Sequence, residues 1–199
     1  NSKFSTLKRR IASISVIHKI KGHYLDTKHP IIMENLHGIK RTLGSRQIAK
    51  KPILINELKL IINVIDEIKI KAKGLVEAKV KSSDVKRDKA LILLGFAGGF
   101  RRSELVNIEH EDIEFVQEGV KIVIKRSKTD QSGEGTIKAI PYFDNEKYCP
   151  VKALKNYMTY GFAIANKGKI FDISDKSVAL IIKKYAQIAG LDSSSYAGH

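Results

Sequence analysis

The sequence predicts a mainly α-helical chain with one small antiparallel β-sheet, an α+β fold. Most apolar residues recur at intervals of three and four positions, which is the period of an amphipathic helix. One stretch changes to a period of two, where Val120, Ile122 and Ile124 alternate with more polar neighbours. Glycine and proline residues punctuate the boundaries between these segments. No internal repeat, low-complexity tract or apolar run of ~18 residues, the length that spans a bilayer, is present.

Two helices are expected at the N-terminal end. The first covers residues 5–20, and Ser5 or Thr6 can cap its start. Pro30 suits the first turn of the second helix, and Gly44 lies just past its end. The apolar positions that define the two helices are Leu7, Ile11, Ile14 and Ile17 in the first and Ile32, Leu36 and Ile39 in the second.

Three more helices are expected before the strands. A long one begins near residue 54 and is followed by a polar break over residues 71–83. Asp84 can cap the next, which Gly98 and Gly99 terminate, and a short helix starts at Ser103. The positions expected to face inward are Leu58, Ile61, Ile65, Ile68, Ala90, Leu91, Leu94, Ala97, Leu105 and Ile108.

A hairpin and two helices complete the pattern. The strand at residues 120–125 returns through a polar, glycine-containing connection to a strand that includes Ile137 and Ile140. Pro150 opens one helix, and Asp175 opens the last, which Gly190 ends. Their apolar positions are Val151, Leu154, Tyr157 and Met158, then Val178, Ile181, Ile182, Tyr185 and Ile188.

The chain divides into two expected domains. Residues 1–48 form a helical fragment, because about 50 residues bury little apolar surface by themselves. Residues 49–53 read as a basic linker, and residues 54–199 form the second domain. The chain begins without Met and ends after a turn-like segment, so we expect both ends to be boundaries of a longer protein.

Charge indicates a polyanionic partner. The formal net charge is +15, and residues 1–51 carry twelve Lys or Arg against two acidic residues. Such a basic segment binds a phosphate backbone through counterion release. A solvated lysine-rich surface remains an alternative, whereas a membrane-surface helix would need an apolar, aromatic opposite face. The expected DNA-binding residues are Lys8, Arg9, Arg10, Lys40 and Arg41.

Metal and disulfide chemistry are not expected. Cys149 is the single cysteine, which excludes an internal disulfide and a multi-cysteine zinc site. The six histidines show no paired ligand spacing, so we predict neither a metal nor a cofactor. The absence of a signal-peptide pattern predicts a cytoplasmic protein. We expect it in a bacterial cell, associated with the nucleoid when it is bound to its polyanionic partner.

Three places could carry chemistry. Arg101 stands where one helix stops and the next begins, so its guanidinium and outward N–H groups could bind a phosphate. Arg101 or Arg102 could instead merely pair with Glu104 or Glu109. Lys128 lies at the tip of the expected hairpin, where it could reach a cleft or be solvated. The third place is the terminal pair Gly198-His199.

In this order the three places resemble the tyrosine recombinases, the phage integrase family. The stretch Ala97-Gly-Gly-Phe-Arg-Arg-Ser-Glu-Leu, followed by Asp112-Ile113, resembles their first arginine box. Aligned on Ser-Glu-Leu, the catalytic arginine falls on Arg101. Lys128 resembles the β-hairpin lysine, and Gly198-His199 the start of the second box. Residues 5–14 and 38–41 resemble the end of the helical core-binding domain.

The resemblance implies an integrase-type catalytic domain that cleaves double-stranded DNA. A tyrosine would form a 3′-phosphotyrosyl link, with Arg101 as a phosphate clamp, Lys128 as general acid and His199 as a phosphate contact. Glu104 would orient the arginine box. Self-association into a synaptic tetramer on DNA is also implied. Tyr185 and Tyr196 precede the second box, so neither matches the nucleophile, and residues 1–199 alone are expected to be inactive.

Other functions remain open from the sequence. A type IB topoisomerase shares this chemistry but relaxes supercoils, and a non-catalytic integrase remnant would only bind DNA. An RNA-binding module would need aromatic stacking platforms on its strands, which the sequence lacks. The target site and the direction of the reaction (integration, excision or resolution) are not encoded in a recognisable motif.

Overall fold

The computed structural model describes residues 2–44, 50–74, 82–125, 135–159 and 167–196, with side chains 69–74 and 82 left aside. It divides into two compact units, Asn1–Ala49 and Lys50–His199. The expected linker began at residue 49, whereas residues 50–53 group with the second unit. The described helices include none that is both long and apolar enough to cross a membrane.

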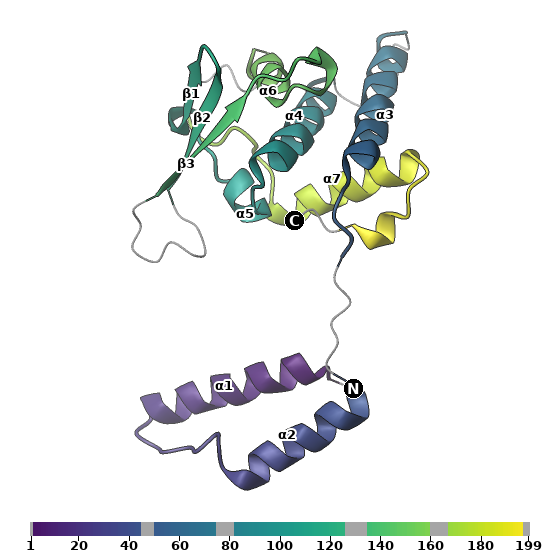
Figure 1. Cartoon of the computed structure of the whole chain (residues 1–199). Helices are drawn as coiled ribbons and strands as arrows, with labels where there is room; N and C mark the ends of the chain where they lie inside the picture. The colour runs from purple at the N-terminus through teal and green to yellow at the C-terminus, as the bar shows by residue number, and fades with distance from the viewer. Residues whose placement is uncertain (1, 45–49, 75–81, 126–134, 160–166, 197–199) are drawn as a thin grey trace. The chain divides into compact units, whose positions relative to one another are not determined.

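Unit 1 is a pair of helices, α1 (Phe4–Ile20) and α2 (Pro30–Leu43), joined by a short connection (Figure 1). Lys3, not Ser5 or Thr6, is the N-cap residue of α1, and no side chain caps that end. Among the described residues of this unit Leu36 is the one buried apolar side chain, while Ile14 and Ile17 are 46% and 53% exposed. Two helices enclose too little volume to cover both apolar faces.

Unit 2 is a helical body with a small sheet on one side. Its helix α4 (Ser82–Gly98) lies between the sheet and α3 (Ile55–Gly74), and α6 (Pro150–Met158) packs along it (Figure 1). The helix α7 (Asp175–Ile188) crosses below and contacts α3, α4 and the short α5 (Arg102–Leu105). The polar break expected over residues 71–83 is wrong at both ends, because α3 continues to Gly74 and α4 begins at Ser82.

The sheet has three antiparallel strands in the order β1 (Ile113–Val116), β2 (Gly119–Ile124) and β3 (Thr136–Pro141). The register pairs Ile113 with Ile122 and Ile124 with Thr136. Gly119 is required opposite Pro141, since a Cβ there would lie 2.0 Å from the carbonyl oxygen of Ile140. The two strands predicted from residues 120–125 and from Ile137 and Ile140 correspond to β2 and β3, which pair directly with each other. Short 3₁₀ turns in the described part of this unit are η1 (His110–Asp112), η2 (Glu146–Tyr148) and η4 (Ser193–Ser195).

One continuous core lies under α4. It includes most of the apolar positions that the sequence assigned to the helices and strands of this unit, among them Ile61, Ile65, Leu91, Leu94, Ile108, Ile122 and Leu154. Cys149 is fully buried, where a free cysteine packs as a small apolar side chain, and its Sγ accepts a hydrogen bond from the Phe143 N–H at 3.4 Å. The sheet contributes Val120, Ile122 and Ile124 to this core while Val123 is 39% exposed, so the period of two is confirmed.

Candidate active site

The turn between α4 and α5 places Arg101 by means of two glycines. A Cβ on Gly98 would lie 2.2 Å from the ring of Phe100, which folds back over this position. Gly99 has φ +55°, a left-handed conformation that glycine adopts without the penalty that other residues suffer. These glycines end α4 and turn the chain so that Arg101 becomes the N-cap of α5.

Arg101 is held by Glu104, one turn along α5. Its Nη1 donates to Glu104 Oε1 at 2.6 Å, and its backbone N–H donates to Oε2 at 3.0 Å. The Glu104 side chain is 6% exposed, whereas that of Arg101 is 47% exposed. The pairing that the sequence left as an alternative is therefore present. It fixes one side of the guanidinium while the side chain stays accessible, so pairing and phosphate binding are compatible.

The buried carboxylate of Glu104 stays charged in this setting. Burial by itself raises the pKa of a carboxyl group, but the hydrogen bonds from Arg101 and the charge of Lys138 outweigh it and hold the pKa of Glu104 below its ordinary value. A charged Glu104 attracts the guanidinium more strongly than a neutral acid would. The geometry therefore fits the orienting role expected for Glu104.

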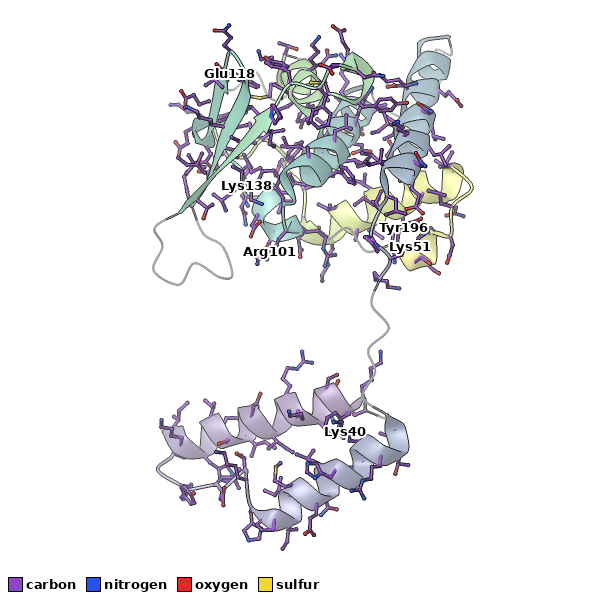
Figure 2. The ribbon with its side chains drawn as sticks, viewed as in Figure 1. Lys40, Lys51, Arg101, Glu118, Lys138 and Tyr196 are labelled. Carbon is purple, nitrogen blue, oxygen red and sulfur yellow. The ribbon has the colours of Figure 1, made fainter. Side chains whose placement is uncertain are left out.

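Lys138 of β3 is a neighbour of Arg101 that sequence reasoning missed (Figure 2). Its Nζ donates to the carbonyl oxygens of Gly98 and Gly99 at 2.8 and 3.1 Å and lies 4.0 Å from Glu104 Oε2. A signal was present in the sequence. Lys138 precedes the buried Ile140 by two residues, so the strand period puts this lysine on the inward face.

Lys128 lies outside the described residues, but the two strands that lead to it are defined. The end of β2 is fastened by Lys125, whose Nζ donates to Glu109 and Glu111 at 2.6 Å each and lies 3.0 Å from Asp112. These hydrogen bonds raise the pKa of Lys125 above its ordinary value. The three carboxylates lie close enough together to hold a cation, and the ammonium of Lys125 fills that place.

His199 also lies outside the described residues, and the segment before it is anchored. The N–H of Lys51 donates to the Ser195 carbonyl at 2.8 Å, and Lys50 Nζ donates to the Ser194 carbonyl at 2.7 Å. Tyr196, which follows η4, is 2% exposed. Residues at the start of unit 2 thus hold the segment that leads to the second box.

The two tyrosines that precede this box, Tyr185 and Tyr196, both have buried side chains. Tyr185 is fully buried and its hydroxyl donates to Asp88 Oδ2 at 2.9 Å. Burial, together with the charge of Asp88, raises the pKa of Tyr185. Burial also raises the pKa of Tyr196. A nucleophilic tyrosine must be accessible and readily deprotonated, so these surroundings do not favour such a role at either position.

The basic residues predicted to contact DNA lie on both helices of unit 1. Lys8, Arg9 and Arg10 are exposed on α1, and Lys40 and Arg41 are exposed on the last turn of α2. The one side-chain contact described among these five is from Arg10 Nη1 to Ser2 Oγ at 3.2 Å. No acidic group described in this unit pairs with them, so their charge faces solvent.

Comparison with known proteins assigns the fold and the family. Residues 63–199 match the phage integrase family. An integrase/recombinase XerD homologue of Selenomonas ruminantium is 40% identical over 214 aligned residues, covering all of this chain and 58% of the relative. Tyrosine recombinase XerA of Pyrococcus horikoshii is 31% identical over 124 residues, 60% of this chain and 42% of the relative. The chain spans about half the length of these relatives.

A solved structure shares the fold. The XerH site-specific recombinase, crystallised with its difH substrate as a pre-cleavage complex, matches with a TM-score of 0.50 at 14% identity. That match covers all of this chain and 56% of the recombinase. The integrase-type fold predicted for the chain is confirmed. With a small antiparallel sheet beside a helical body and a family match over most of its length, the chain belongs to the phage integrase family of tyrosine recombinases.

Proposed function

We propose that this chain is part of a site-specific recombinase that cleaves and rejoins DNA through a 3′-phosphotyrosyl intermediate. The observation that carries the proposal is the Arg101 site in a chain 40% identical to an integrase/recombinase. A half-exposed guanidinium is fixed by a buried carboxylate at the start of a helix, which suits a phosphate oxygen. The solved neighbour with its DNA substrate agrees with a DNA partner.

The proposed chemistry divides the work among three side chains. Arg101 stabilises the charge that develops on the phosphate, in the way that a fixed donor stabilises an oxyanion. Lys128 protonates the 5′ oxygen as it leaves, and His199 hydrogen-bonds a phosphate oxygen. Glu104 acts through Arg101 by fixing its orientation. No step in this scheme consumes a nucleotide, because the phosphotyrosyl link retains the bond energy for rejoining.

Unit 1 is proposed to grip the duplex. Its exposed Lys8, Arg9, Arg10, Lys40 and Arg41 would contact the phosphates of the duplex. Synapsis of two sites would require a tetramer of the whole protein. We keep the domain boundaries predicted from the sequence. Residues 1–48 are proposed to be part of the core-binding domain, and residues 54–199 part of the catalytic domain.

The general-acid role of Lys128 can be tested with a sulfur-substituted substrate. In a protein that carries the tyrosine beyond residue 199, Lys128→Ala should cleave ordinary DNA slower by roughly 10²–10⁴-fold. A substrate with sulfur in place of the bridging 5′ oxygen releases a stable thiolate, so Lys128→Ala should cleave it nearly as fast as the unmutated protein. Arg101→Ala should stay slow on both substrates. Failure of sulfur to restore Lys128→Ala would assign the acid to another group.

Recombination and relaxation are separated by a second assay. Two labelled duplexes that carry the target site should exchange strands in the presence of the active protein. Relaxation of a supercoiled circle without any exchange would instead favour the type IB topoisomerase alternative. Binding without either product would favour a non-catalytic remnant.

A further inference from the structure

Lys138 is the side chain that joins the sheet to the arginine box. It comes from the inward face of β3, and its side chain is 26% exposed. Its ammonium lies 4.5 Å from the centre of the Phe100 ring, besides its two carbonyl contacts. It therefore contacts every residue of the turn from Gly98 to Phe100 that delivers Arg101 to α5.

The turn needs such an anchor because of its composition. Two successive glycines lose more conformational entropy on ordering than any other pair of residues. The sequence before Arg101 therefore does little by itself to fix the backbone conformation of the turn. The carbonyl groups at the end of α4 also lack partners within the helix. The Lys138 ammonium donates hydrogen bonds to the carbonyl oxygens of Gly98 and Gly99. Its positive charge also complements the partial negative charge at the C-terminal end of α4.

The same ammonium stabilises the partner of Arg101. Glu104 Oε2 receives the Arg101 N–H at 3.0 Å and has Lys138 Nζ 4.0 Å away, while Oε1 receives the guanidinium. With the side chain only 6% exposed, this carboxylate is poorly hydrated, so nearby positive charge matters more than it would at the surface. Lys138 thus acts on Arg101 through the backbone on one side and through Glu104 on the other.

We propose that Lys138 is a positioning residue for the reaction, which sets the place and orientation of Arg101 without touching the DNA. The inference rests on the proposed function of Arg101. A direct phosphate contact is the rival role, and the geometry disfavours it, because the ammonium is directed at two carbonyl oxygens and a carboxylate.

Replacement of Lys138 tests the proposal in a protein that carries the nucleophile. Lys138→Met keeps the apolar stem and removes the charge, and Lys138→Arg restores a donor to the carbonyls. Lys121→Met, on the exposed face of β2, removes the same charge as a control. We expect Lys138→Met to slow single-turnover cleavage at saturating DNA by at least about tenfold, because small displacements of a catalytic group are costly. DNA affinity should match that of Lys121→Met, and Lys138→Arg should recover most of the rate.

A double-mutant cycle with Arg101→Lys separates positioning from general stability. If Lys138 acts through Arg101, Lys138→Met should lose much less rate in the Arg101→Lys background than in the unmutated one. Equal losses in both backgrounds would overturn the proposal, as would an unchanged rate. A parallel loss of affinity and rate would identify a phosphate contact instead. Lys138→Gln, which removes the charge but keeps the N–H donors of an uncharged amide, replaces Lys138→Met if the latter does not fold.

A second measurement is independent of cleavage. In residues 1–199, the carboxyl resonance of Glu104 followed by NMR against pH should titrate higher in Lys138→Met than in the unmutated chain, while Lys121→Met leaves it in place. An unchanged Glu104 titration would show that the contact is absent. If the longer protein that carries the nucleophile forms no covalent adduct with DNA, the proposed function fails, and this titration still decides whether Lys138 acts on Glu104.

Discussion

Replacement of Tyr185 by phenylalanine removes one buried hydrogen bond and little else. The Tyr185 hydroxyl donates to Asp88 Oδ2 at 2.9 Å, while Asp88 Oδ1 accepts from Arg87 Nε and Nη2 at 3.0 and 2.8 Å. Asp88 is 2% exposed, so water does not replace a lost donor there. This hydrogen bond fastens α7 to α4 across 97 positions of sequence. Phenylalanine keeps the ring, so no cavity forms.

The magnitude follows from the carboxylate that is left behind. A buried acceptor without its donor costs about 1–3 kcal/mol, with the upper part expected for a charged group. For a chain of this size each kcal/mol lowers the unfolding midpoint by roughly 2–4 °C, so Tyr185→Phe should lower it by about 4–8 °C for a 2 kcal/mol loss.

Urea and thermal unfolding of the 199-residue chain, followed by circular dichroism, measure this effect. Tyr24→Phe is the matched control, since it deletes the same hydroxyl from a side chain that is 90% exposed, and it should leave both midpoints in place. An unfolding curve for Tyr185→Phe that overlays the unmutated one would refute the reasoning. A covalent DNA adduct that maps to Tyr185 would refute it more completely, because it would make this tyrosine the nucleophile.

Four further outcomes are expected. In a protein with the nucleophile, Arg101→Lys should lose roughly a hundredfold in cleavage, since lysine lacks the guanidinium fork, while Arg102→Lys loses far less; equal losses would move the arginine box by one residue. Binding of random duplex should weaken steeply with salt, each phosphate contact adding roughly 0.9 to the log–log slope, and removal of residues 1–49 should flatten it; an equal slope without them would exclude unit 1 as the grip. Residues 1–199 alone should give no covalent adduct with a nicked suicide substrate on a denaturing gel. Hydrogen bonds from the Leu54 N–H and from Lys51 lower the pKa of Glu57 from its ordinary value of 4.5 to about 2. The charged Glu57 side chain therefore contributes its full stabilisation above about pH 4.5, and this stabilisation is lost as the pH falls toward 2. Glu57→Gln should lack that part of the acid dependence in urea titrations, and identical pH profiles would contradict the contact.

The sequence by itself determined most of the elements, although not β1, and it predicted the position of the arginine box. Periods of three and four marked the helices, the period of two marked β2, and the glycine pair marked the end of α4. These signals are local, because a helix or strand repeats its inward positions within a few residues. The resemblance on Ser-Glu-Leu is what singled out Arg101 and Glu104, and the structure shows that the two side chains contact each other within one turn.

The sequence pattern was weaker where local signals conflict. The polar residues after position 70 were interpreted as a break, yet α3 runs to Gly74, because the backbone hydrogen bonds of a helix do not require apolar side chains. Ile14 and Ile17 matched a helical stripe, but unit 1 encloses too little volume to bury them. Periodicity reports which residues share a face and not whether a partner covers that face.

Contacts between distant positions were decided by the tertiary structure alone. Lys138 reaches Gly98 across 40 positions, and Tyr185 reaches Asp88 across 97. No spacing rule connects such residues, because their approach depends on how β3 and α7 pack against α4. The chain's charge and its arginine box could thus be interpreted from the sequence, whereas the lysine that we propose positions that box emerged only when packing brought the sheet and the turn together.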